Sequence, residues 1–99
     1  MPGVFAFHVP NGGKRGIVEA VKFKRMGVKA GVPDVIALAG GKVHALELKA
    51  PGGRLSPAQR QTMIDMESAG ARTAVASSLD EALITLEVWG ILKRGSVAA

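Results

Sequence analysis

The feature that most constrains the fold is a pair of short, mainly apolar runs, residues 35–39 and 42–49, that flank Gly40-Gly41. Two β-type runs around a Gly-Gly pair are a strong signal for an antiparallel hairpin with a two-residue turn. Counting back from that turn makes Asp34 face Glu47. The sequence therefore predicts two carboxylates directly opposite each other at the open end of a hairpin.

Opposed carboxylates in a sheet repel each other, because cross-strand neighbours lie only about 5 Å apart. Such a pair needs a cation between the side chains or a proton on one of them. Lys49 follows Glu47 by two residues and projects from the same face. Both strands are apolar almost throughout, as expected when both faces are covered. The pattern favours a divalent-metal site for phosphodiester chemistry, and the alternative is a surface triplet in which Lys49 neutralises Asp34 and Glu47.

Each member of this triplet has a chemical role in the metal interpretation. Mg²⁺ uses one or two carboxylates plus waters and phosphate oxygens, so Asp34 and Glu47 suffice as side-chain ligands. Lys49 would orient the attacking water or offset charge in the transition state. Glu19, in an expected helix, could reach the metal through a water or bind a second ion. Alternatively, Glu19 is an exposed carboxylate paired with Lys22.

Composition limits the remaining possibilities. The chain has no cysteine, which excludes disulfides and thiolate metal sites. No apolar run approaches the roughly 20 residues of a membrane span, and the start of the chain lacks a signal-type pattern, so we expect a soluble protein that is not secreted. Residues 1–60 hold ten Lys/Arg against three acids, whereas residues 61–99 hold three against five. This basic half suits a polyanion, although a merely solvated surface is the alternative.

Several basic residues are candidates for contacts with a nucleic-acid backbone. The loop Gly12-Gly13-Lys14-Arg15 lacks the spacing of a phosphate-binding Walker motif, so nucleotide hydrolysis is rejected. A flexible basic loop that touches phosphates is the functional interpretation, and a solvated loop the alternative. The expected nucleic-acid contacts are Lys14, Arg15, Lys22, Arg54 and Arg60, of which the last two flank a helix start.

The remaining pattern predicts one α/β domain over residues 1–99, with a mixed central sheet flanked by helices. Strands are expected at 4–9 and 72–77, a loop at 10–16 and a helix at 17–26, and the tail after residue 93 is expected to fray. Ser56, Pro57 and Gln59 predict a capped helix that ends near Ala69, so capping alone could explain Gln59.

Ser78 to Glu81 repeats the capping-box pattern before a last helix. The apolar face expected for that helix comprises Leu79, Ala82, Leu83, Leu86 and Trp89. His8 and His44 are expected to be packed or exposed strand residues and not ligands, because His44 alternates onto the face opposite Glu47.

Four blocks, in order along roughly residues 5–90, resemble a known family. They are Asn11-Gly12-Gly13-Lys14-Arg15, then Gly27-Val28-Lys29-Ala30-Gly31-Val32-Pro33-Asp34, then Glu47-Leu48-Lys49, then Leu55-Ser56-Pro57-Ala58-Gln59. Together they resemble the virus-type replication-repair nuclease domain, VRR-NUC, a branch of the PD-(D/E)XK nucleases. The resemblance implies a restriction-endonuclease-like core that hydrolyses DNA phosphodiesters with Mg²⁺ or Mn²⁺.

The resemblance also implies residue roles. Asp34, Glu47 and the main-chain carbonyl of Leu48 would bind metal, and Lys49 would be the catalytic lysine. Glu19 matches the acidic residue of the family's first helix and joins the metal-binding and catalytic set, while Gln59 matches a supporting glutamine.

In size, the chain resembles the stand-alone members of this family. That resemblance implies a homodimer of phage or prophage origin that acts in the bacterial cytoplasm on branched DNA such as four-way junctions. Flaps or plain duplex as substrate, a DNA-binding module with a degenerate site, and a small interaction protein are the alternatives.

Overall fold

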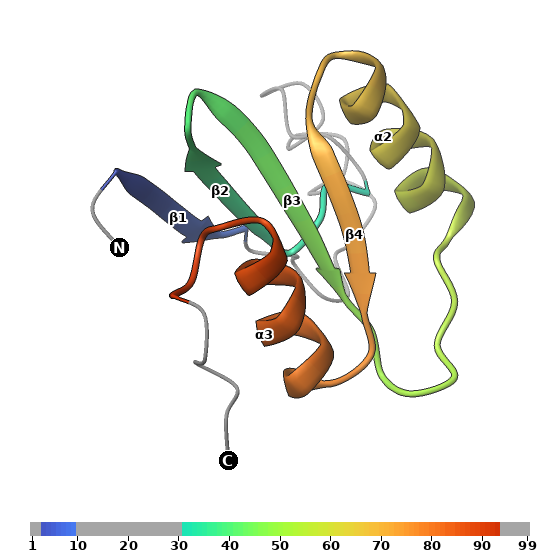
Figure 1. Cartoon of the computed structure of the whole chain (residues 1–99). Coiled ribbons are helices and arrows are strands. Elements are labelled where there is room, and N and C mark those ends of the chain that lie inside the picture. The colour runs from blue at the N-terminus through green and yellow to red at the C-terminus, as the bar shows by residue number, and fades with distance from the viewer. Residues whose placement is uncertain (1–2, 10–30, 94–99) are drawn as a thin grey trace.

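The computed structural model describes residues 3–9 and 31–93 of the chain (Figure 1). Its elements are β1 (Val4–His8), β2 (Val35–Ala39), β3 (Lys42–Leu48), α2 (Pro57–Ser68), β4 (Arg72–Ala76) and α3 (Leu79–Val88). The strands expected at 4–9 and 72–77 are present and each end one residue earlier. The loop expected at 10–16, the helix expected at 17–26 and the tail after residue 93 lie outside the described residues.

The four strands form one sheet in the order β1-β2-β3-β4. β1, β2 and β3 are successively antiparallel, and β3 and β4 are parallel. A parallel pair needs a crossover connection, and α2 supplies it between β3 and β4 (Figure 1). The predicted α/β fold with a mixed sheet is confirmed, and β1 is an edge strand next to β2 among the strands that the structure describes.

The hairpin turn is the two-residue kind that the Gly-Gly pair predicts. Gly40 and Gly41 both have positive φ, 60° and 72°, as a type I′ turn requires. The observed register pairs Ile36 with Ala45, so the predicted facing of the two strands is confirmed. Because β3 runs on past the start of β2, its last residues lie beside the residue that precedes β2.

The two helices cover opposite faces of the sheet. Leu46 of β3 packs with Ala82 and Leu86 of α3 and with Trp89, which caps that helix, to form the core on one face. The next residue, Glu47, contacts α2 on the other face. His44 shares the α3 face, where its buried ring lies 5.2 Å from that of Trp89. His44 is therefore packed on the face opposite Glu47, as predicted.

Two details of the last helix differ from the prediction. Leu79 is 73% exposed, because it is the first residue of α3 and precedes the turn in which Ala82 reaches the core. The Ser78 hydroxyl accepts the Glu81 N–H as expected, but the Glu81 carboxylate accepts the N–H of Ser77. The expected capping box is thus only half formed.

The expectation that both faces of the hairpin are covered is correct for its centre and wrong for its ends. Ile36, Ala45 and Leu46 are buried, whereas Leu38 and Leu48 are 43% and 45% exposed. Leu48 lies on the α3 face beyond Leu46, the core residue that α3 covers, whereas Leu38 lies on the opposite face near the hairpin turn, and the helix on that face, α2, packs against β4.

Candidate active site

The predicted site residues meet where β3 ends and β2 begins. Asp34 immediately precedes β2 and follows Pro33, which is fully buried. The backbone carbonyl of Asp34 accepts the N–H of Val9 at 2.7 Å, which ties this position to the end of β1. Asp34 is therefore held by its neighbours on two strands, beside Glu47 and Leu48 at the end of β3.

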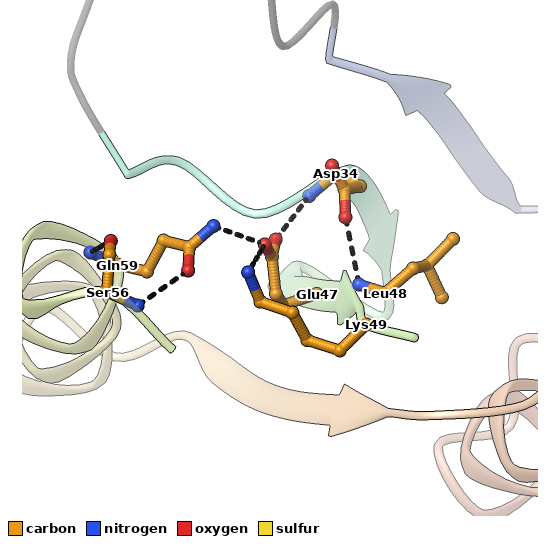
Figure 2. Close-up of polar contacts among 6 residues, drawn as sticks. All are labelled: Asp34, Glu47, Leu48, Lys49, Ser56 and Gln59. Carbon is orange, nitrogen blue, oxygen red and sulfur yellow. Dashed lines mark hydrogen bonds and ion pairs between the residues drawn. The ribbon is translucent and has the colours of Figure 1, made fainter. Parts of the chain in front are cut away.

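Two reciprocal hydrogen bonds join Asp34 to the end of β3 (Figure 2). The N–H of Asp34 donates to Glu47 Oε2 at 3.2 Å, and the N–H of Leu48 donates to Asp34 Oδ2 at 2.9 Å. Each strand thus uses a backbone donor to orient a carboxylate of the other. The opposition of Asp34 and Glu47 that the turn count predicts is present.

Gln59 joins this pair from the first turn of α2. Its amide oxygen accepts the N–H of Ser56 at 2.8 Å, and the Ser56 hydroxyl accepts the N–H of Gln59 at 3.1 Å, which completes a capping box. The amide nitrogen then donates to Glu47 Oε1 at 2.7 Å (Figure 2). Capping alone does not account for Gln59, because its two amide atoms serve the helix start and the buried carboxylate together.

Lys49 approaches the same carboxylate from the strand end. Its Nζ lies 3.6 Å from Glu47 Oε1, and its side chain is 20% exposed whereas that of Glu47 is 3% exposed. The backbone N–H of Lys49 donates to the carbonyl of Ala76 on β4 at 2.9 Å. The ammonium group therefore reaches from a fixed backbone toward the surface side of the buried carboxylate.

The backbone of Leu48 faces Asp34. Its N–H donates to the Asp34 side chain, whereas the N–H of the following Lys49 points to β4. The N–H and C=O of one strand residue point to the same edge of the strand. The Leu48 carbonyl is thus on the side of Asp34, where an oxygen ligand from the main chain would join the two carboxylates. We call Asp34, Glu47, Leu48, Lys49 and Gln59 the carboxylate site.

Burial raises the pKa of the Glu47 carboxyl above its usual value of 4.5, and the charge of Asp34 and a side-chain hydrogen bond with Asp34 raise it further. The Lys49 ammonium and the N–H of Asp34 act in the opposite direction. Desolvation and a like charge both disfavour the ionised form, and the net effect is a raised pKa. A divalent cation beside the carboxylate would instead favour the ionised form.

The donor set suits a hard divalent cation. Within residues 3–9 and 31–93, no group of three or more His, Cys, Asp or Glu side chains forms a metal cluster. Mg²⁺ does not need one, because it is usually held by one or two carboxylates with waters and substrate phosphates completing its shell. The carboxylates of Asp34 and Glu47 and the carbonyl of Leu48 are oxygen donors of that kind.

Of the other candidate residues, only two lie within the described part of the chain. Glu19, Lys14, Arg15 and Lys22 lie outside the described residues. Arg54 and Arg60 are exposed on either side of the start of α2, within the same region as Gln59. Their position agrees with the prediction that they flank a helix start, and their contact with nucleic acid stays a prediction.

Gly31 is a positioning residue that no sequence pattern singles out. It has a positive φ of 79°, and a Cβ added there would lie 2.5 Å from the backbone carbon and oxygen of Ala58 and 2.7 Å from the nitrogen of Gln59. Glycine therefore lets the segment before Asp34 touch the first turn of α2. Its position two residues before Pro33 is a signal for a turn, but not for this contact.

The mixed sheet with a helix on each face, and an Asp, a Glu and a Lys at one strand end, define an α/β domain of nuclease type. The chain belongs to the VRR-NUC domain family, whose model matches residues 8–80. The family predicted from the four sequence blocks is thus confirmed.

One solved structure similar to this chain is that of a "VRR_NUC domain protein". The two share 29% sequence identity and a TM-score of 0.72 over 85% of this chain. The chain spans 66% of the length of that protein. No curated protein matches the chain. Within the described residues, no helix is both long and apolar enough to cross a membrane.

Proposed function

We propose that this chain is a metal-dependent DNA endonuclease of the PD-(D/E)XK type, with Mg²⁺ as its cofactor and Mn²⁺ as a substitute. The observation that carries the proposal is the buried Glu47 carboxylate, which faces Asp34 and has the Lys49 ammonium 3.6 Å away. A buried carboxylate with a second carboxylate beside it is costly unless the two bind a cation or share a proton. Membership of a nuclease family makes a metal ion the more fitting explanation.

Asp34, Glu47 and the carbonyl of Leu48 would hold the cation. When bound, a divalent ion supplies positive charge that polarises a phosphodiester and lowers the pKa of water. Lys49 would orient the attacking water or offset negative charge that develops on the phosphate. Gln59 and the N–H of Asp34 each hydrogen bond to the Glu47 carboxylate, so they would keep both of its oxygens oriented before the substrate arrives. Glu19 is proposed as a further acidic member.

The proposed substrate is branched DNA, such as a four-way junction, cut by a homodimer in the cytoplasm of a bacterium carrying a phage or prophage. The excess of ten Lys/Arg over three acids in residues 1–60 suits the phosphate backbone. Lys14, Arg15, Lys22, Arg54 and Arg60 are proposed to contact it. Symmetric cuts in a junction need two sites, and a dimer with twofold symmetry would supply them.

A cleavage assay tests this function. Purified protein is incubated with Mg²⁺, Mn²⁺ or EDTA and with labelled four-way junction, flap, linear duplex or single strand. We expect paired symmetric cuts in the junction that need a divalent metal. Binding without cleavage at every metal would leave a DNA-binding module, and the absence of salt-sensitive binding would favour an interaction protein.

Two variants test the site within the same assay. Lys49→Ala and Asp34→Asn should each abolish cutting and leave the thermal transition present. Lys42→Ala is the matched control, because Lys42 is an exposed lysine at the opposite end of the same strand. If Lys49→Ala or Asp34→Asn cuts as fast as Lys42→Ala, the carboxylate site is not the catalytic centre.

A further inference from the structure

The outer edge of β1 lacks the features that usually protect an edge strand. β1 is the first strand of the sheet and, among the described residues, pairs only with β2 (Figure 1). Edge strands are usually protected by charged side chains, proline or a bulge. The five residues of β1, Val-Phe-Ala-Phe-His, include no Lys, Arg, Asp, Glu or Pro, and Phe5 and Phe7 are 65% and 45% exposed. Within residues 3–9 and 31–93, no other strand covers this edge, so it is available for pairing.

The hydrogen-bonding groups of β1 that point away from β2, and that have no partner strand among the described residues, belong to its even-numbered residues. Val9 donates its N–H to Asp34 across the β1–β2 pair, and backbone groups alternate in direction along a strand. The odd-numbered residues therefore face β2. Val4, Ala6 and His8 direct their N–H and C=O groups to the outer edge, with Ala6 at the centre.

We propose that a second copy of this chain pairs with β1 in antiparallel orientation, with Ala6 on the twofold axis. Val4 of one copy then opposes His8 of the other, and Ala6 opposes Ala6, which gives three hydrogen-bonded pairs that exchange two bonds each. Phe5 opposes Phe7 of the second copy at the two intervening positions, where side chains approach most closely.

This self-complementarity favours a copy of the same chain over another partner. The two phenylalanines are placed symmetrically about Ala6, so the pairing brings aromatic rings together on one face. Aromatic cross-strand pairs stabilise sheets. Leu38, 43% exposed and opposite Phe5 on β2, widens the apolar surface on that face. The strand also carries no Lys or Arg, which limits charge repulsion between two copies of a chain with net charge +5.

The pairing also sets the relation between the two carboxylate sites, a consequence that rests on the proposed function. The twofold axis is perpendicular to the joined sheet, so both sites lie on the face of α2. Asp34 is the partner of Val9, three residues along from Ala6 and one strand further from the axis. With about 3.3 Å per residue and about 4.8 Å between strands, the two Asp34 positions are about 25 Å apart. The two sites could thus act on one branched substrate.

Sedimentation analysis without metal or DNA tests the interface separately from the nuclease function. We expect a dimer for the unmodified chain, and monomers for Ala6→Pro and Phe7→Glu. Proline at position 6 removes an outward N–H and is tolerated at an edge, so the fold should survive. Leu79→Glu is the matched control, because it places the same charge on an exposed apolar residue of α3 and should remain dimeric. A monomeric unmodified chain, or variants that stay dimeric, would overturn the proposal.

A single cysteine tests the register. The chain contains no cysteine, so Ala6→Cys can form only one intermolecular disulfide. Residues in a hydrogen-bonded antiparallel pair have Cα atoms about 5.5 Å apart, within the range that a disulfide spans. We expect rapid cross-linking of Ala6→Cys and none of Leu79→Cys under mild oxidation. A dimer in which Ala6→Cys does not cross-link would place the interface elsewhere, whatever the nuclease assay gives.

Discussion

Replacing Gly31 with alanine tests how the carboxylate site is held together. Gly31 has φ +79°, and its missing Cβ would lie 2.5 Å from two backbone atoms of Ala58 and 2.7 Å from the nitrogen of Gln59. Ordinary van der Waals contact begins at 3.4 Å, so the two backbones would have to separate by about 0.9 Å. Neither partner is the end of a flexible side chain, so neither yields easily.

Two contributions set the expected cost of this substitution. A non-glycine residue in the left-handed region costs about 1–2 kcal/mol. Forcing an extra carbon into a closely packed contact costs a further 1–3 kcal/mol, roughly. We therefore expect Gly31→Ala to lower the free energy of unfolding by about 2–5 kcal/mol, which for a domain of this size lowers Tm by at least about 8 °C.

The substitution should also disturb the carboxylate site, because the segments on both sides of the contact carry hydrogen-bond donors to Glu47. Gly31 is three residues before Asp34, whose N–H donates to one Glu47 oxygen, and it touches Gln59, whose amide donates to the other. Separating the two segments moves these donors apart. We expect weaker divalent-metal binding, measured by calorimetry under conditions in which the variant is fully folded.

Gly90→Ala is the matched control, because Gly90 has φ +76° and its added Cβ would meet no atom within 4 Å. This variant should carry only the backbone cost of about 1–2 kcal/mol and leave metal binding unchanged. Urea unfolding of both variants measures the difference. If Gly31→Ala is as stable as Gly90→Ala and binds metal equally well, the contact does not position the site, and the reasoning fails.

Three further predictions concern the carboxylates and their hydrogen-bond partners. Because the folded state raises the pKa of Glu47, that carboxyl contributes stability below its unfolded pKa that is lost as the pH rises through its folded value. Metal-free protein should therefore lose stability as the pH rises above about 4.5, and Glu47→Gln should reduce this dependence; equal pH profiles of the two proteins in urea unfolding would contradict the assignment. Gln59→Ala should lower the free energy of unfolding, measured in urea, by about 2–4 kcal/mol, because it removes a hydrogen bond to a carboxylate and half of a capping box. Gln61→Ala is its control: it loses only an exposed hydrogen bond to Asp65 and should lower that free energy by under about 0.5 kcal/mol. Mg²⁺ or Mn²⁺ at about 100 times its Kd should stabilise the protein by about 2.7 kcal/mol in thermal melts, with EDTA reversing the gain; Asp34→Asn should show a much smaller shift, and an equal shift would show that the ion binds elsewhere.

The parts of the site that could be predicted from the sequence depend on short-range rules. The Gly40-Gly41 turn fixes the hairpin register, and the two-residue periodicity of strands then places Asp34 against Glu47. Ser56 and Gln59 are likewise recognisable as a helix cap, because the interacting groups are three residues apart. These features need no knowledge of how distant segments dock.

The parts that could not be predicted depend on docking between distant segments. The bond from Gln59 to Glu47 joins α2 to β3, and its formation requires the crossover to place the first turn of α2 over the end of that strand. The same holds for the contact of Gly31 with that turn. The exposure of Leu79 follows from where α3 meets the sheet, and helical periodicity alone does not contain that information.

The carboxylate site is also where local structural preferences conflict, and that conflict is an argument for function. Two carboxylates face each other across a sheet, and Glu47 is almost completely buried, an arrangement that weakens the metal-free fold. Gln59, Lys49 and the N–H of Asp34 each hydrogen bond or pair with that carboxylate, yet the pKa of Glu47 is still raised. A site serving stability alone would gain from a neutral residue at position 47. The loss of stability at Glu47 is understandable if a bound cation offsets it. The two carboxylates are then already oriented before the ion and its substrate bind.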